Sequence, residues 1–430
     1  MTVSARSAHS VSYTQLLRQN RNYRRLWIGQ VVSYLGDWFN QVAVLGLVLQ
    51  LTHSPFVAGL TLISSNLPAF FLSPLAGVFV DRWPRRQVMI ASDVLRAMAA
   101  LGFLLVHDIN QIWLVLLFSS LLVGISAFFY PASTAAIPNL VESRELVTAN
   151  SLSNATWGVM LTLGAAFGGA VSTLFGRDVA FVVNSASFLF SAVMIASIRG
   201  RFEEEHDPAS QRGGGWEELR QGVTFVGQRR DILALILVKG GWGLGGGVLV
   251  LLSIFGQQVY HGGDLAIGVL YSARGFGALL GPMLARPFSG SSMRRVKLAI
   301  AAGIAVTGLG YIGFGLAPSL IPPPAETTGP VLASILVLPA VCVMIAHIGG
   351  GTMWVLSTTL LQQLSPDRFR GRVFAVDNGL GTLTIALSTL LMSYGAERAP
   401  AEWVAIAGGL VLLLYGLAWG AVVVPSRLAE

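Results

Sequence analysis

The sequence is poor in charged residues and in cysteine. Only 11% of its 430 residues are charged and 53% are hydrophobic, whereas a typical soluble domain has about 25% charged residues. One hydrophobic core of a soluble protein stops growing at roughly 250–300 residues, so it could not bury this much apolar surface. The shortage of charge therefore excludes a soluble globular protein. The single cysteine, Cys342, excludes a framework of disulfides.

The sequence also lacks the motifs of common catalytic sites. It contains no H-E-x-x-H, no G-x-S-x-G and no cluster of histidine and cysteine residues. It has no G-x-x-x-x-G-K-[ST] phosphate-binding loop, which argues against an ATP-driven motor within this chain. We therefore expect no enzyme, no catalytic residues, no metal and no cofactor. A membrane-embedded enzyme or receptor is the remote alternative.

Long apolar runs are abundant, and the mean hydropathy is +0.66. A helix needs about 20 apolar residues to cross a hydrocarbon core ~30 Å thick, and it satisfies its own backbone polar groups. The first 24 residues are polar and the first apolar run is too long for a signal peptide, so we expect an uncleaved first span. We predict twelve transmembrane helices at residues 26–51, 57–80, 87–106, 112–135, 146–174, 179–198, 232–257, 264–285, 297–317, 330–361, 373–394 and 402–424.

Basic residues are distributed unevenly across the predicted membrane. Of the 28, Arg177 and Arg398 lie in loops on one side, Arg96, Lys239 and Arg274 lie within spans, and the rest share the side of both termini. The positive-inside rule therefore predicts that both termini are cytoplasmic. The net charge of +7 then reflects loops that face acidic lipids. We expect membrane lipids, and no nucleic acid, as partners.

The longest hydrophilic interruption divides the spans into six and six. The predicted organisation is a cytoplasmic N-terminal segment at 1–24, a six-helix bundle at 25–199, a linker at 200–231, a second bundle at 232–424 and a cytoplasmic tail at 425–430. Within the linker, Trp216, Leu219, Val223 and Val226 recur at helical spacing, which predicts a helix at the membrane interface. A partner-binding helix is the alternative.

The two halves carry related sequences at equivalent places. Leu140–Arg144 (LVESR) precedes span five, and Leu364–Arg368 (LSPDR) precedes span eleven. Two related six-helix halves around a central cavity are a recurrent plan of secondary transporters. We therefore predict an all-α integral membrane protein, with twelve transmembrane helices in two pseudo-symmetric halves.

The loop between spans two and three carries a family resemblance. Its sequence, GVFVDRWPRR from Gly77 to Arg86, resembles the G-x-x-x-D-R-x-G-R-R signature of the major facilitator superfamily, with Pro84 in place of a glycine. The stretches Ser33–Asp37, Ile137–Val141 and Arg368–Val373 are similar to a bacterial branch that contains enterobactin exporters and macrolide efflux proteins. The resemblance implies a monomeric, multi-pass exporter of small molecules in the bacterial cytoplasmic (inner) membrane.

This signature predicts a gate at the cytoplasmic face. Gly77 permits close helix approach, and Asp81, next to Arg82, can cap the positive N-terminus of span eleven near Arg372. We expect such contacts to form when the protein opens outward and to break when the halves separate on the cytoplasmic side. A basic turn that only sets topology is the alternative.

Further charges are predicted to belong to the same gate. Arg85 and Arg86 can pair with carboxylates such as Asp93 or Asp377, both of which lie near the cytoplasmic ends of their spans. Asp93 is also three residues before Arg96, a spacing at which the two side chains can neutralise each other on a helix. A structural role for this pair is favoured over proton transfer.

Span five carries Gly164, Gly168 and Gly169 in a pattern that resembles the superfamily's antiporter motif, with Ala165 in place of its proline and Met160 in place of an earlier glycine. Small residues let membrane helices pack closely. Helix packing is therefore the favoured prediction, and proton antiport is the alternative.

Asp37 lies near the middle of span one. A charged residue at a helix centre costs ~2.5–3.5 kcal/mol on insertion scales, so it usually faces a cavity or a partner. Asn40 and Gln41 follow one turn later and add polar groups. We predict that Asp37 couples proton movement to transport or binds a cationic substrate, and that Arg274 in span eight attracts an anionic group or pairs with an acid. A purely structural hydrogen bond by Asp37 is the alternative.

Together these features predict a proton-coupled exporter of bulky amphipathic small molecules such as a drug, a macrolide or a siderophore. Its partners would be the substrate, protons and membrane lipids. The alternative is a lipid or metabolite facilitator, or a flippase, of the same fold.

Overall fold

The computed structural model describes residues 11–199, 202, 215–288, 292–323 and 329–426, and these form helices without a β-strand. Twelve helical segments within them are long and apolar enough to cross a membrane. The predicted fold class is therefore confirmed, and the protein is a multi-pass membrane protein. The twelve spans occur in the predicted order, and several ends differ from the prediction by a few residues.

The first half begins with a short helix that the hydropathy pattern did not predict, α1. Its helices are α1 (Tyr13–Gln19), α2 (Arg21–Thr52), α3 (Pro55–Ser64), α4 (Leu67–Arg82), α5 (Arg85–Leu101), α6 (Ile112–Leu140), α7 (Leu146–Phe175) and α8 (Arg177–Ala196). Ser12 caps α1 by accepting a hydrogen bond from the Gln15 amide, and Leu16 is buried against the first half. One buried apolar residue in seven is too weak a pattern to stand out in the sequence.

The second half follows the linker helix α9 (Gly215–Gln228). Its helices are α10 (Arg230–Gly246), α11 (Val248–Ile254), α12 (Gly263–Ala285), α13 (Met293–Leu320), α14 (Gly329–Leu364), α15 (Asp367–Ala396) and α16 (Ala401–Val423). Helix α15 begins at Asp367, directly after Pro366, and its apolar span begins at Phe369, close to the predicted start near Arg372. Proline supplies a φ suited to the beginning of a helix.

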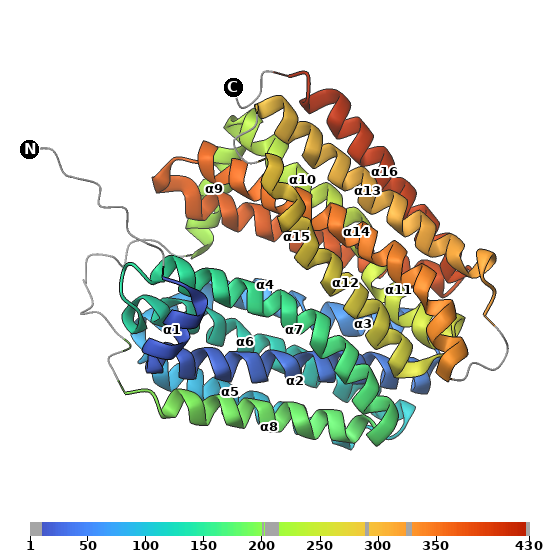
Figure 1. Ribbon diagram of the computed structural model, residues 1–430, viewed down its shortest axis with the longest axis horizontal. Helices are drawn as coiled ribbons and strands as arrows, with labels where there is room; N and C mark the ends of the chain where they lie inside the picture. The colour runs from blue at the N-terminus through green and yellow to red at the C-terminus, as the bar shows by residue number, and fades with distance from the viewer. Residues whose placement is uncertain (1–10, 200–201, 203–214, 289–291, 324–328, 427–430) are drawn as a thin grey trace, which may run out of the picture.

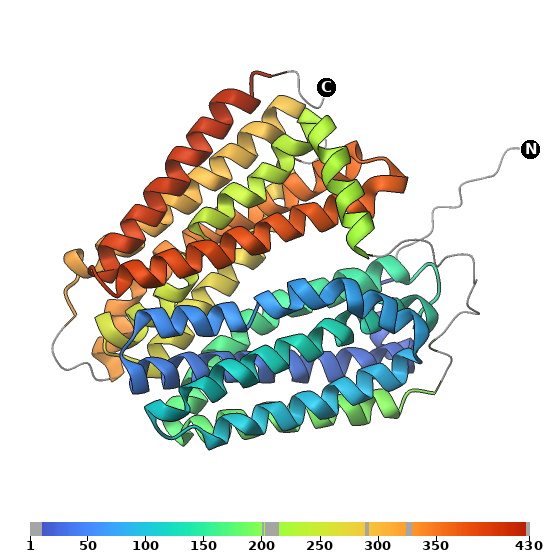
Figure 2. The same ribbon diagram turned by 180° about the vertical axis from the view of Figure 1, so that it is seen from behind.

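The two bundles lie one above the other (Figure 1), and the view from behind shows the same separation (Figure 2). Helices α1 and α9 lie at one end of the molecule, which we call the linker end. The turn between α2 and α3 lies at the opposite end, which we call the far end. The ribbons of the two bundles approach each other at the far end and diverge toward the linker end.

Two of the transmembrane spans are each divided into two helices by a short break. Span two breaks at Ser65 and Asn66, between α3 and α4. Span seven breaks at Gly247, whose amide donates to the Ser388 hydroxyl at 2.8 Å. A Cβ at Gly247 would collide with the backbone of Ser388, so only glycine allows α15 to lie this close.

The two halves pack most closely along α7 and α12. A Cβ at Gly169 would lie 2.6 Å from the carbonyl oxygen of Asp264, and a Cβ at Gly268 would lie 2.5 Å from that of Ala165. Farther along, the Ser272 hydroxyl donates to the carbonyl oxygen of Thr162 at 2.8 Å. Small residues on both helices therefore form the contact between the halves.

The linker helix α9 packs against the second half. The rings of Phe225 on α9 and Phe369 on α15 stack with centroids 4.2 Å apart, and Gly222 faces the backbone of Arg372. The predicted helix is therefore present. Its position at a membrane interface stays a prediction.

Candidate functional site

Asp37 lies midway along α2 and is half-buried. Asn40 follows one turn later and is 8% exposed. The Oδ1 atom of Asn40 and the Nε2 atom of Gln41 have no hydrogen-bond partner within the part of the chain that the structure describes. Buried polar atoms usually have a hydrogen-bond partner. The unpaired atoms of Asn40 and Gln41, next to Asp37, are therefore able to bind a further group.

A second carboxylate and a guanidinium lie close to Asp37. Asp93 and Arg96 on α5 form an ion pair, and both side chains are almost completely buried. The Arg96 guanidinium lies over the rings of Phe129 and Phe188, with its Cζ atom 4.2 and 4.4 Å from their centroids. Asp37 is within electrostatic range of both members of the pair. This group therefore has two carboxylates and one guanidinium.

The arginines of the loop signature contact backbone oxygens. Arg85 donates to the carbonyl oxygen of Ala135 at 2.9 Å, and Arg86 donates to that of Ala196 at the end of α8. Pairing of these arginines with Asp93 or Asp377 was predicted for the outward-open state. In the present arrangement Asp93 pairs with Arg96 instead. The side chains at Gly77, Asp81 and Arg82 lie outside the described residues, although their backbone belongs to α4.

Asp377 has a partner that the sequence analysis did not assign. Its carboxylate pairs with the ammonium group of Lys239 on α10, and both side chains are buried. The Nζ atom of Lys239 also lies 4.4 Å from the ring centroid of Trp354. In this arrangement Asp377 therefore pairs within the second half, and its predicted pairing with the loop arginines in the outward-open state stays a prediction.

Arg274 lies on α12 where this helix faces the first half. Its Cζ atom is 6.0 Å from the ring centroid of Trp38 on α2 and 5.8 Å from that of Tyr271. Its Nε atom is buried and has no hydrogen-bond partner among the described residues. Nearby, Tyr311 and His347 lie within hydrogen-bonding distance of each other at 3.3 Å.

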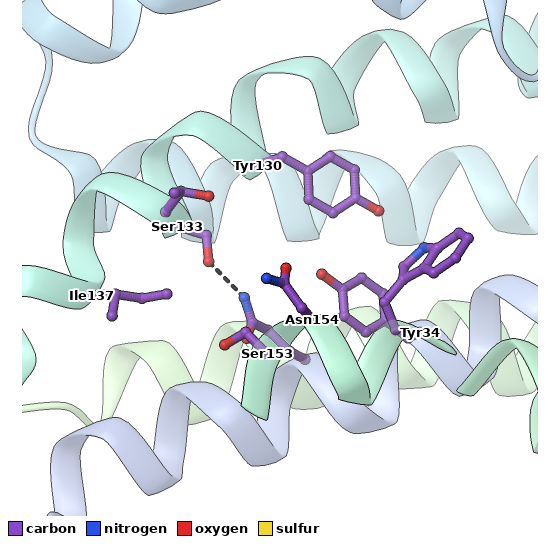
Figure 3. A pocket seen from close by; sticks show the side chains of 9 residues that line it. Tyr34, Tyr130, Ser133, Ile137, Ser153 and Asn154 are labelled. Atoms are coloured by element: carbon purple, nitrogen blue, oxygen red, sulfur yellow. Dashed lines mark hydrogen bonds between the residues drawn. The ribbon is translucent and has the colours of Figure 1, made fainter. Parts of the chain in front are cut away.

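A cavity of about 360 Å³ lies within the first half, between α2, α6 and α7. Because α2 runs from the linker end to the far end, Gln30 and Tyr34 place this cavity on the linker side of Asp37. Figure 3 shows the side chains of Tyr34, Tyr130 and Asn154 around it. No charged residue lines it: its walls are Gln30, Tyr34, Tyr130, Ser133, Thr134, Ile137, Ser153, Asn154 and Trp157.

The glycines of span five contact both halves. A Cβ at Gly164 would lie 2.7 Å from the Cβ of Trp38, and one at Gly168 would lie 2.8 Å from the Cα of Phe39, both on α2. Gly169 faces α12 of the second half, as described above. The motif therefore packs α7 against α2 on one side and against α12 on the other.

The far end holds contacts between the halves that the sequence analysis missed. Arg177 binds both carboxylate oxygens of Asp264 at 2.7 and 2.8 Å. Glu397 accepts hydrogen bonds from the Ser54 hydroxyl at 2.9 Å and the Phe56 amide at 3.0 Å. The only signal for the ion pair is that Arg177 is one of two basic residues in loops on that side.

The family model of the Major Facilitator Superfamily matches residues 26–339. The chain belongs to this superfamily. Among curated superfamily relatives, macrolide efflux protein A of Streptococcus pyogenes is 22% identical, over 90% of this chain and 93% of the relative. The putative bacilysin exporter BacE of Bacillus subtilis is 25% identical, over 93% of each chain. The uncharacterized transporter YfiS of Bacillus subtilis is 27% identical, over about half of each chain (49% and 50%).

Solved superfamily structures share the fold. A bacterial homolog of the human lysosomal transporter Spinster, in an inward-facing conformation, has a TM-score of 0.69 and 14% identity, with 94% of this chain and 96% of that chain covered. A bacterial homologue of the iron transporter ferroportin has a TM-score of 0.68 and 16% identity, with 93% and 99% covered. As a member of the Major Facilitator Superfamily, the protein is a transporter of small molecules rather than an enzyme.

Proposed function

We propose that this transporter exports amphipathic small molecules from the bacterial cytoplasm in exchange for protons. The single observation that supports this most directly is Asp37. It is a carboxylate midway along α2, the described residues give it no ion-pair partner, and the cavity lined by Tyr34 lies about one helical turn away on the linker side. Two of the curated relatives that match most of the chain are named for efflux or export.

The proposed orientation puts the linker end in the cytoplasm, as the basic loops favour. In the present arrangement the far end is then closed by the contact of Arg177 with Asp264 and by Glu397 with the start of α3. The cavity beside Tyr34 would receive substrate from the cytoplasmic side. Asp37 would release its proton on this side and take up a proton after the halves have opened to the other side.

The gate at the linker end belongs to this proposal. In the present arrangement, Arg85 and Arg86 donate hydrogen bonds to carbonyl oxygens of their own half. We propose that closure brings the end of α4, with Asp81, to the start of α15. The chain then acts as a monomer, because both halves needed for alternating access belong to one polypeptide.

An accumulation assay in pump-deficient bacteria tests the proposal. Labelled macrolides, dyes and siderophores are measured in cells that express the wild type or Asp37→Asn, with and without a protonophore. We expect lower accumulation of at least one compound, and we expect the protonophore and the substitution each to abolish the difference. A flux that persists without the proton gradient would instead favour the facilitator or flippase.

A further inference from the structure

Six charged side chains lie well inside the twelve spans, three acidic and three basic. They are Asp37, Asp93, Arg96, Lys239, Arg274 and Asp377. Four of them form two buried ion pairs, one in each half, as described above. The other two are Asp37 in the first half and Arg274 in the second half. Among the described residues, neither has an ion-pair partner.

The two remaining charges lie on opposite sides of the contact between the halves. Asp37 is on α2, whereas Arg274 on α12 reaches across to the ring of Trp38, the residue next to Asp37. Both charges are thus near one place along the membrane normal. The two side chains do not form an ion pair with each other in the described structure, so neither charge neutralises the other.

The surroundings of each charge suit a ligand rather than a structural partner. Beside Asp37, the amide groups of Asn40 and Gln41 have unused hydrogen-bonding atoms. Around Arg274, the groups that face it from other helices are aromatic: Trp38 from α2, Tyr311 from α13 and His347 from α14. A guanidinium with unused donors binds a carboxylate well, because it presents them in a fork that matches two oxygens.

A charge at mid-membrane is costly unless an opposite charge or water accompanies it. A ligand that carried only an amine would compensate Asp37 and leave Arg274 unpaired, and an acid would do the reverse. A ligand with both groups compensates both charges at once. We propose that the transported molecule is a zwitterion whose amine binds Asp37 and whose carboxylate binds Arg274.

This inference rests on the proposed function only in taking Asp37 to face the substrate. It adds that recognition spans both halves, so substrate binding itself would draw the two halves together.

The test is calorimetric titration of the purified full-length protein in detergent with capped peptides. Phenylalanyl-leucine, its C-terminal amide, its N-acetyl form and the doubly capped form share one apolar body and differ only in charge. Peptides of one, two and three residues vary the separation of the charges, by at most ~3.3–3.6 Å per residue. The protein variants are Arg274→Gln, Arg274→Lys and Asp37→Asn. Arg398→Gln, which removes the same charge outside the spans, is the control.

For the wild type we expect at least one zwitterion of the series to bind about tenfold or more tightly than either of its singly capped forms, as for hydrogen bonds to charged groups. Arg274→Gln should abolish the effect of capping the carboxyl group and keep the effect of capping the amine. Asp37→Asn should do the opposite, and Arg398→Gln should behave as the wild type. If capping either end of every peptide leaves wild-type affinity unchanged, the zwitterion proposal is wrong.

Binding in detergent needs no proton gradient, so it separates this inference from the proposed function. If capping the peptides does not change their affinity but the protein exports other compounds in response to a proton gradient, only the zwitterion proposal is wrong. Charge-selective binding without dependence of transport on a proton gradient would overturn only the proposed coupling. Should Arg274→Gln fail to fold, the capped ligands on the wild type and on Arg274→Lys still decide the question.

Discussion

Arg177 and Asp264 join the two halves at the far end through a bidentate ion pair, with nitrogen–oxygen distances of 2.7 and 2.8 Å. The two side chains are 17% and 5% exposed, so solvent screens this pair less than it would screen a surface pair. Gly46 faces it, and a Cβ there would overlap the Asp264 carboxylate. This contact therefore stabilises the present arrangement of the two halves at the far end.

Breaking this pair should shift the transporter away from the present arrangement. In a Cys342→Ser background, a cysteine in place of Ser153 in the cavity reports access from the linker end. We expect Arg177→Gln to lower its rate of labelling by a hydrophilic maleimide by up to roughly fivefold, because about 1 kcal/mol changes the ratio of the two states by that factor. Gly46→Ala should act in the same direction.

Gly227→Ala is the matched control for the alanine variant, because no atom lies within 4 Å of a Cβ at that position. Equal labelling rates in the wild type and in Arg177→Gln would contradict a stabilising role for the ion pair.

The α7–α12 contact should not accept even one added methyl group. A Cβ at Gly169 would lie 2.6 Å from a backbone oxygen of α12, so one of the two helices must move. Overpacking of this kind costs about 1–3 kcal/mol. We expect Gly169→Ala to lower the melting temperature in detergent by several degrees. An unchanged melting temperature would show that the two halves do not depend on this contact.

Hydropathy was sufficient to predict the twelve helical spans, because each span must satisfy its own backbone polar groups within the bilayer. The breaks at Ser65 and Gly247 were not predicted, since they depend on which neighbouring helix approaches. Glycine-rich stretches occur in several spans, and only the position of α15 identifies Gly247 as a break.

The candidate site was only partly predictable. Asp37 and Arg274 could be identified from the sequence, because a charged side chain in an apolar span costs free energy whichever face of the helix it occupies. The partner of Asp377 is Lys239, which is 138 residues away, and no local spacing relates the two. The cavity is lined by ordinary tyrosine, serine and asparagine side chains from three helices. Their common direction is a property of helix rotation, which a single sequence does not specify.

The pair of Lys239 and Asp377 should be structural. Removing one partner of a buried pair leaves an uncompensated charge and costs ~3–5 kcal/mol, whereas replacing both by apolar residues is often neutral. We therefore expect Lys239→Met to lower the melting temperature strongly and Lys239→Met with Asp377→Leu to restore much of it. A double variant as unstable as the sum of the single variants would contradict this.

The neutral cavity should contribute to substrate affinity without contributing to stability. Asn154 lines it, and Asn154→Leu would fill part of its about 360 Å³ with apolar atoms. We expect weaker binding of any compound that the accumulation assay identifies, with a melting temperature close to that of the wild type. Asn139→Leu is no suitable control, because the Asn139 amide donates to the Phe202 carbonyl oxygen. Thr359→Val is more suitable, since Thr359 is an exposed residue outside the cavity. Unchanged binding by Asn154→Leu would exclude the cavity from the substrate path.

The central claim is that proton movement through Asp37 drives export. The most direct measurement uses purified protein in sealed vesicles, with an imposed pH gradient and a pH-sensitive dye inside. The wild type should move protons when a transported compound is added, and transport should speed up as the gradient is increased. Asp37→Asn should bind the compound but show neither proton movement nor dependence on the gradient. Gradient-driven transport that survives Asp37→Asn at the wild-type rate would contradict the account.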